Sequence, residues 1–81
     1  MTRDEFFKHL QHLDRPFEIQ PPPQGFLNNR FTLGNWDGHH VIIRTENSDV
    51  DFFLPYNLIE GITPGTLKVT KTIRVTGKSF E

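Results

Sequence analysis

Residues 31–54 carry the pattern that most restricts how this chain can fold. Apolar and polar residues alternate there on both sides of two polar breaks, Trp36-Asp37-Gly38 and Asn47-Ser48. A period of two sends successive side chains to opposite faces of an extended strand, and a short polar break between two such runs is typical of a hairpin. The pattern therefore predicts consecutive antiparallel strands at residues 29–35, 39–46 and 49–54.

The face that is to be buried fixes the register of the first hairpin. Pairing Phe31 with Ile43 and Leu33 with Val41 keeps all of these side chains on one face and leaves a three-residue loop that ends in Gly38. Glycine at that position suits the left-handed residue of a bulged hairpin loop. A two-residue Asp-Gly loop is the alternative, but it would mix apolar and polar residues on both faces.

The second hairpin turns at Asn47-Ser48 and satisfies both a packing and a charge criterion. On its inward face it pairs Thr45 with Val50, Ile43 with Phe52 and Val41 with Leu54. On the opposite face Arg44 meets Asp51, and opposite charges on neighbouring strands stabilise such a pairing. The expected inward residues are Phe31, Leu33, Val41, Ile43, Val50, Phe52 and Leu54.

The composition agrees with one small β-rich domain that spans residues 1–81. A chain of this length buries about 60–65% of its unfolded surface, and eight phenylalanines with no alanine favour strands over helices. The absence of cysteine excludes disulfides, thiolate metal sites and a Cys nucleophile. A net charge of −1 and the lack of a long apolar run predict a soluble, cytoplasmic domain without a membrane partner.

One helix is expected, at residues 3–14. Thr2 and Glu5 have the spacing of a capping box, and Phe6, Leu10 and Leu13 form one apolar stripe. Arg15-Pro16 ends the helix, because the residue before a proline is pushed out of the α region. The remaining expected elements are a strand at 17–20, a Pro-rich connector at 21–25, a helical turn at 56–62, a strand at 66–76 that bends or splits at Lys71, and a frayed tail at 78–81.

These elements predict an α+β, mostly β, fold with an N-terminal helix and a meander of four or five antiparallel strands. The apolar face of the sheet needs a cover, so the sheet either stays open beneath the helix or closes into a small barrel. We predict the barrel, because closure also removes exposed sheet edges. The layout, with a short turn at residues 53–62 leading into the last strand, resembles Sm-like and related SH3-like barrels. Sm-like RNA-contact signatures are not present, so the resemblance implies no site residues.

The outward face of the hairpins is the most suggestive surface for function. The preferred register places Ile42 and Phe53 side by side on it, and an adjacent apolar pair bordered by Arg, His and Trp has the composition of a protein interface. The expected interaction residues are Trp36, His40, Ile42, Arg44, Phe53 and Arg30. The partner would be another protein or a second copy of the chain. The alternative is that the helix stripe or the chain around Phe26 and Leu27 simply covers this patch.

Other functions have weaker support in the sequence. Lys68, Lys71 and Arg74, with Trp36 as a stacking group, would suit single-stranded nucleic acid, but the chain as a whole is not basic. An enzyme with a carboxylate or His centre is the third possibility. No nucleophile motif, phosphate-binding loop or zinc spacing is present, and His39 and His40 point to opposite faces of a strand. We therefore predict a non-enzymatic domain without metal or cofactor.

Overall fold

The computed structural model describes residues 1–46 and 48–81, which form an N-terminal helix followed by short strands. This order confirms the predicted mostly β fold with one N-terminal helix. The elements are α1 (Arg3–His9), a 3₁₀ turn (Leu10–His12), β1 (Glu18–Gln20), β2 (Phe31–Trp36), β3 (His40–Thr45), β4 (Asp51–Pro55), a second 3₁₀ turn (Tyr56–Leu58), β5 (Ile59–Thr63), β6 (Thr66–Val69), β7 (Val75–Thr76) and β8 (Ser79–Phe80).

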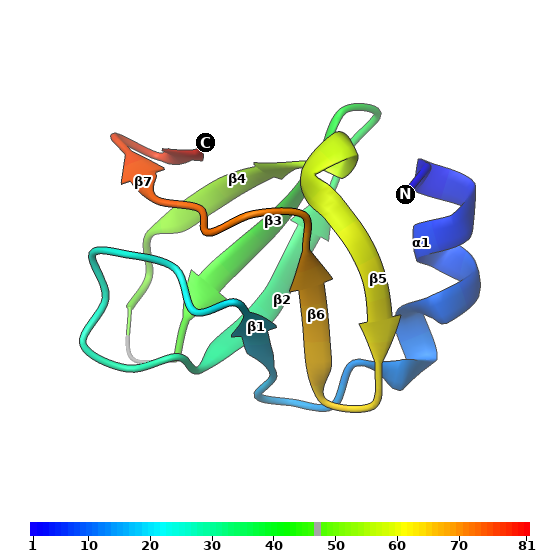
Figure 1. The fold of residues 1–81 in the computed structure, drawn as a ribbon, viewed down its shortest axis with the longest axis horizontal. Helices are drawn as coiled ribbons and strands as arrows, with labels where there is room; N and C mark the ends of the chain where they lie inside the picture. The colour runs from blue at the N-terminus through cyan, green and yellow to red at the C-terminus, as the bar shows by residue number, and fades with distance from the viewer. Residues whose placement is uncertain (47) are drawn as a thin grey trace.

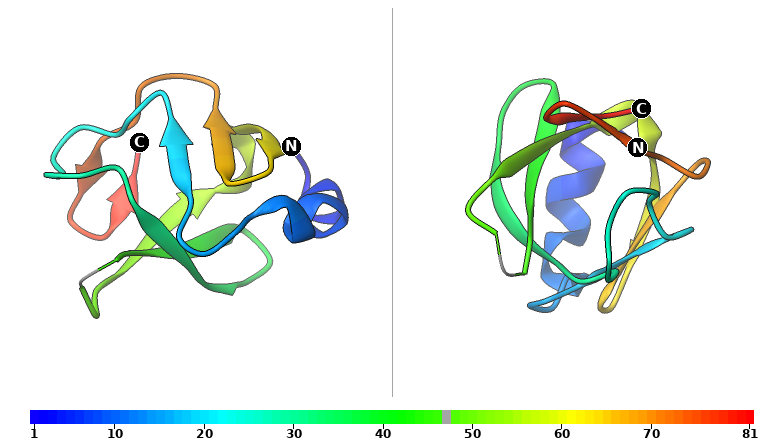
Figure 2. Two further views of the ribbon diagram at one scale, coloured as in Figure 1. Left: turned by 90° about the horizontal axis from the view of Figure 1, so that it is seen from below. Right: turned by 90° about the vertical axis from the view of Figure 1, so that its left-hand side faces the viewer.

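The strands form a five-stranded sheet in the order β2-β3-β4-β8-β7 and a three-stranded sheet in the order β1-β6-β5. Figure 1 shows β5 and β6 in front of β2 and β3, with α1 at one end of the molecule beside β5, and the right-hand view of Figure 2 shows the two sheets on facing sides. An isolated bridge between Phe17 and Phe31 links the sheets at one edge. Within the described residues the sheets are not joined into one closed ladder, so closure into a barrel stays a prediction.

Two pairings depart from the predicted antiparallel meander. β1 runs parallel to β6, and β4 runs parallel to β8. Parallel neighbours need a long crossover connection, and here each pair is separated by several intervening elements. Patterns within a short window cannot reveal such a contact, because its two partners lie far apart in the sequence.

The first hairpin keeps the predicted faces but not the predicted register. Phe31 pairs with Thr45 and Leu33 pairs with Ile43, a slip of two residues, and a bulge between Leu33 and Trp36 then brings Trp36 opposite Val41. The predicted register is therefore wrong. A slip of two residues leaves every side chain on its original face, so burial alone could not distinguish the two pairings.

Gly34 allows the close approach of β2 and β3 at this bulge. Gly34→Ala is expected to lower the free energy of unfolding by about 1–3 kcal/mol, because a Cβ atom there would lie 2.8 Å from the carbonyl oxygen of Ile42. Gly61→Ala is the matched control, since no atom of the described residues, other than Gly61 and its chain neighbours, lies within 4 Å of its Cβ position. Equal effects of the two substitutions in urea unfolding would contradict the close approach.

The second hairpin has the predicted register. Its inward pairs are Ile43 with Phe52 and Val41 with Leu54, and Arg44 faces Asp51 as expected. The predicted inward position of Val50 is wrong, because β4 begins only at Asp51 and the Val50 side chain is 43% exposed. The Val50 N–H instead donates to the Ser48 hydroxyl at 3.1 Å. Of the predicted Asn47-Ser48 loop, Asn47 lies outside the described residues.

The C-terminal segment was predicted to fray, and this prediction is wrong. Ser79 and Phe80 form β8, and the Phe80 side chain is only 2% exposed. Its ring centroid lies 5.9 Å from that of Phe26 and 5.8 Å from that of Phe52. The tail therefore contributes a large aromatic side chain to the core.

The other predicted segments are confirmed in part. The helical turn at 56–62 is present only as the 3₁₀ turn Tyr56–Leu58, after which the chain continues as β5. The strand at 66–76 splits around Lys71 into β6 and β7. In the connector at 21–25, Pro23 is buried and Gln24 forms a bridge with Arg74.

The N-terminal helix begins as its capping signal predicts. The Thr2 hydroxyl accepts the Glu5 N–H at 3.2 Å and lies 3.3 Å from the Glu5 carboxylate. The α-helix is shorter than predicted and tightens into the 3₁₀ turn from Leu10. Phe6 is fully buried, and Leu10 and Leu13 also pack against the core. None of the described helices has the length and apolar character needed to cross a membrane.

Candidate protein-interaction site

Alternate residues of β2, β3 and β4 point away from the core and form the outward face of the five-stranded sheet. Ile42 lies opposite Phe53 on this face, with Ser79 of β8 beside Phe53. Both large side chains are partly exposed, and neither belongs to the core cluster or packs against it. The two side chains thus form an apolar pair on the solvent side of the sheet.

The elements expected to cover this pair lie on the opposite side of the sheet. The ring of Phe26 packs edge-on at 5.3 Å from both Phe31 and Phe52, which are inward residues. The helix residue Phe6 packs against Tyr56 at 5.7 Å within the core. Figure 1 shows α1 at one end of the molecule, beside β5 of the three-stranded sheet. In the described part of the chain, therefore, neither the helix nor the loop around Phe26 covers Ile42 and Phe53.

Ion pairs border the apolar pair on one side. Arg44 Nε lies 2.5 Å from the Asp51 carboxylate, and Arg30 Nε lies 2.9 Å from the Glu46 carboxylate. The hydrogen bond and charge of Asp51 raise the pKa of Arg44 above its ordinary value. Each ion pair joins one positive and one negative side chain, so this side of the face has both signs of charge and no net charge.

His40 borders the apolar pair on the other side. Its ring meets the ring of Phe53 edge-on at 5.9 Å, and its Nδ1 atom lies 3.6 Å from the carboxylate of Asp37. The Asp37 carboxylate also accepts the backbone N–H groups of His39 and His40, each at 2.7 Å. These hydrogen bonds hold the turn and fix the position of His40 next to Phe53.

The turn predicts a specific pH dependence of stability. The two backbone hydrogen bonds hold the pKa of Asp37 below its ordinary value of 3.8. A lowered native pKa stabilises the fold above the unfolded-state pKa, and this contribution is lost as the pH falls through the native value. Wild-type protein should therefore exceed Asp37→Asn in stability at about pH 6, and the difference should shrink below about pH 4. Urea unfolding of both proteins across this range tests it, and a constant difference would contradict it.

Trp36 was predicted to lie in the hairpin loop, but it is part of β2. It ends β2, and the bulge turns it toward the helix, where its ring lies 5.1 Å from that of Phe7 and 6.2 Å from that of Phe6. The predicted placement of Trp36 at the tip is wrong, because the extra residue in the bulge reverses the face of the side chains that follow it. Trp36 therefore does not share the outward face with Ile42.

The other predicted interaction residues do lie on the outward face. Arg44 and His40 flank Ile42 along β3, Phe53 lies opposite on β4, and Arg30 precedes β2. The predicted register of the first hairpin would have placed Thr32 beside Ile42 and Phe53, and this is wrong, because the slip aligns Thr32 with Arg44 and Asp51. Ser79 was not expected on this face, because it joins the face only through the parallel pairing of β8 with β4.

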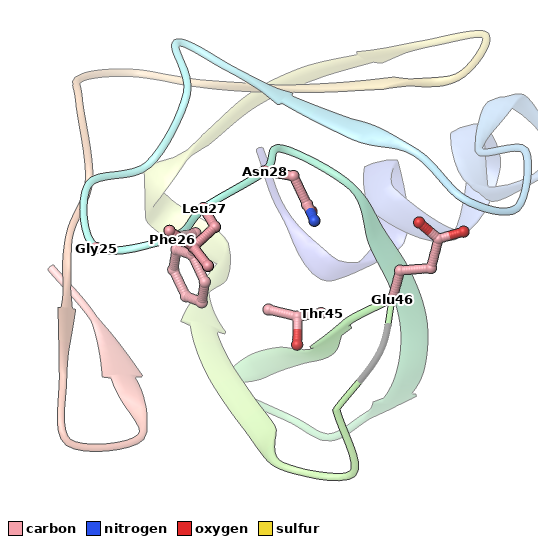
Figure 3. A pocket seen from close by; sticks show the side chains of 6 residues that line it. All are labelled: Gly25, Phe26, Leu27, Asn28, Thr45 and Glu46. Atoms are coloured by element: carbon pink, nitrogen blue, oxygen red, sulfur yellow. The ribbon is translucent and has the colours of Figure 1, made fainter.

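A pocket of about 290 Å³ lies between the loop that contains Phe26 and the end of β3. Figure 3 shows its lining residues, which come from the loop after the Pro-rich connector and from the end of β3: Gly25, Phe26, Leu27, Asn28, Thr45 and Glu46. Leu27 on its rim is fully exposed. The volume is slightly below the range usual for pockets that hold drug-sized ligands, so the pocket is a weaker candidate than the sheet face.

The residues expected for nucleic-acid binding do not form a comparable site, and the histidines are not grouped with other metal-binding side chains in the described part of the chain. Lys68, Lys71 and Arg74 are exposed, but Trp36, the expected stacking group, packs against α1. The rings of His9 and His12 lie 5.9 Å apart on the helical segment. Within residues 1–46 and 48–81, no three His, Asp or Glu side chains are grouped to hold a metal ion.

Comparison with known proteins gives no relative: no protein-family model matches the chain, and neither the curated proteins nor the solved structures contain a significant match.

Proposed function

We propose that this chain is a small, non-enzymatic protein-interaction domain that binds a partner through the outward face of its five-stranded sheet. The observation that carries the proposal is the pair Ile42 and Phe53, which stands partly exposed while the helix and the Phe26 loop pack on the other face. Burial of this pair by a partner would remove apolar surface from water, which is the main driving force of protein association.

The surroundings of the pair suit a binding surface. Protein interfaces are enriched in aromatic and Arg side chains at the centre and polar groups at the rim, and here Phe53 and Ile42 are bordered by Arg44 and His40. Strand pairing on both sides and the contact with His40 hold Phe53 in place. A side chain that is already ordered loses little entropy on binding. The proposal includes a cytoplasmic location, which the absence of cysteine favours.

Site-specific photo-crosslinking in cells tests this function. A photoreactive phenylalanine analogue replaces Phe53 in one variant and Gln20 in the control variant. Gln20 is exposed on β1 of the other sheet. The proposal predicts protein adducts at position 53 and none at position 20. Equal labelling at both positions, or no adduct at position 53, would overturn it.

Single-stranded nucleic-acid binding is the alternative function, and it would use the exposed cations Lys68, Lys71 and Arg74. Binding of this kind weakens steeply as the salt concentration rises. If mixed-sequence oligonucleotides bind at low salt and Lys71→Glu weakens that binding while a charge at position 53 does not, the alternative replaces the proposal.

A further inference from the structure

The composition of the outward face restricts which partner can bind it. On the Arg44 side of the apolar pair the charged side chains are Arg30, Glu46, Arg44 and Asp51, and each is already in an ion pair; on the other side His40 lies 3.6 Å from the carboxylate of Asp37. A strongly acidic or strongly basic partner would meet an equal number of like and unlike charges. A complementary surface should itself contain both signs of charge next to an apolar centre.

The register of β3 and β4 supplies such a surface within the chain itself. Two outward pairs across β3 and β4 each combine two different side chains. Arg44 faces Asp51, and Ile42 faces Phe53. Consider a two-fold axis parallel to the strands and midway between β3 and β4. It would set β3 of one copy over β4 of the other, so that Arg44 lies over Asp51 and Ile42 lies over Phe53 of the second copy. The symmetry repeats each of these contacts, as an isologous interface requires.

From this complementarity, and resting on the proposed function, we propose that the partner is a second copy of this chain, packed face to face through β3 and β4 about that two-fold axis. Aligned packing of this kind is common between sheets, with the layers about 10 Å apart. The Ile42 and Phe53 side chains of both copies fill the centre, and the Arg and Asp side chains lie toward the rim.

Complementary charge variants test this arrangement by sedimentation velocity. Arg44→Asp makes this part of the face acidic, whereas Asp51→Arg makes it basic. Each variant alone should dimerise at least about tenfold more weakly than the wild type, because like charges then face each other across the two-fold axis. An equimolar mixture should recover the dimer, since each acidic side chain then faces an arginine of the other variant. Circular dichroism checks that both variants are folded.

The possible results separate the inference from the proposed function. A wild-type dimer that weakens in both variants and recovers in the mixture supports the second copy as partner. A wild-type monomer, or a dimer that neither variant weakens, overturns this inference. If photo-crosslinking at position 53 then gives adducts with a different protein, the proposed function stands with another partner. If position 53 gives no adduct, the function falls as well.

Discussion

Phe80→Ala is expected to lower the free energy of unfolding by about 3–5 kcal/mol, although the residue is next to the last in the sequence. Its side chain is 2% exposed and packs against Phe26 and Phe52, so truncation leaves a cavity in the core. A small domain has a total stability of about 5–15 kcal/mol, and this loss would remove a large part of it. Urea unfolding followed by circular dichroism measures the change.

Ser79→Ala is the control for this prediction, because Ser79 is the exposed neighbour of Phe80 in β8. It should change the stability by less than about 0.5 kcal/mol. If Phe80→Ala had as little effect as Ser79→Ala, the C-terminal segment would not be part of the core, and the parallel pairing of β4 with β8 would be wrong.

Ile43→Asp is expected to unfold the protein, whereas Ile42→Asp is expected to leave it folded and to abolish binding at the outward face. The two isoleucines are adjacent in β3 and point to opposite faces. Ile43 is fully buried, and an unpaired carboxylate there should cost at least about 4 kcal/mol. At the partly exposed Ile42 the carboxylate can remain hydrated in the monomer, but it would be desolvated in a complex.

Circular dichroism and sedimentation velocity on the two variants give the result. The expected outcome is an unfolded Ile43→Asp protein and a folded, monomeric Ile42→Asp protein. Unfolding by both substitutions would show that Ile42 belongs to the core, and the face would then have no apolar surface to offer a partner.

The hairpin of β3 and β4 was predictable because packing and charge selected the same register. Pairing Ile43 with Phe52 buries both, and the same register brings Arg44 to Asp51. The predicted pairing of β2 with β3 contains no pair of opposite charges. Burial of the apolar side chains is then the only criterion, and it is satisfied equally well after a slip of two residues. The true register of this hairpin also contains a bulge beside Gly34, and a lone glycine in a strand signals a bulge without fixing its position.

The pairings of β1 and β8 could not be predicted from local patterns. Each strand is only two or three residues long, and each pairs in parallel with a distant strand. Phe80 is an isolated aromatic residue in a polar tail, so no periodicity marks it as buried. Its burial depends on the arrangement of Phe26 and Phe52, which is known only from the whole fold.

The sequence was sufficient to predict that Ile42 and Phe53 point away from the core, but not whether another part of the chain covers them. Alternation along β3 and β4 was sufficient to place Ile42 and Phe53 outward. Whether another element covers them depends on the path of α1 and of the loop around Phe26, and both could equally have packed outside. Trp36 was misplaced for a related reason, since the bulge that precedes it changes which way it faces.

Methyl NMR of isoleucine-labelled protein with a soluble paramagnetic agent tests the uncovered binding face most directly. Five of the six isoleucines are buried, and Ile42 is the exception. In dilute protein the Ile42 methyl signal should broaden far more than the other signals. In concentrated protein this broadening should fall as the second copy covers the residue. An Ile42 signal that is already protected in dilute protein would contradict the account, because the face would then be covered within a single chain.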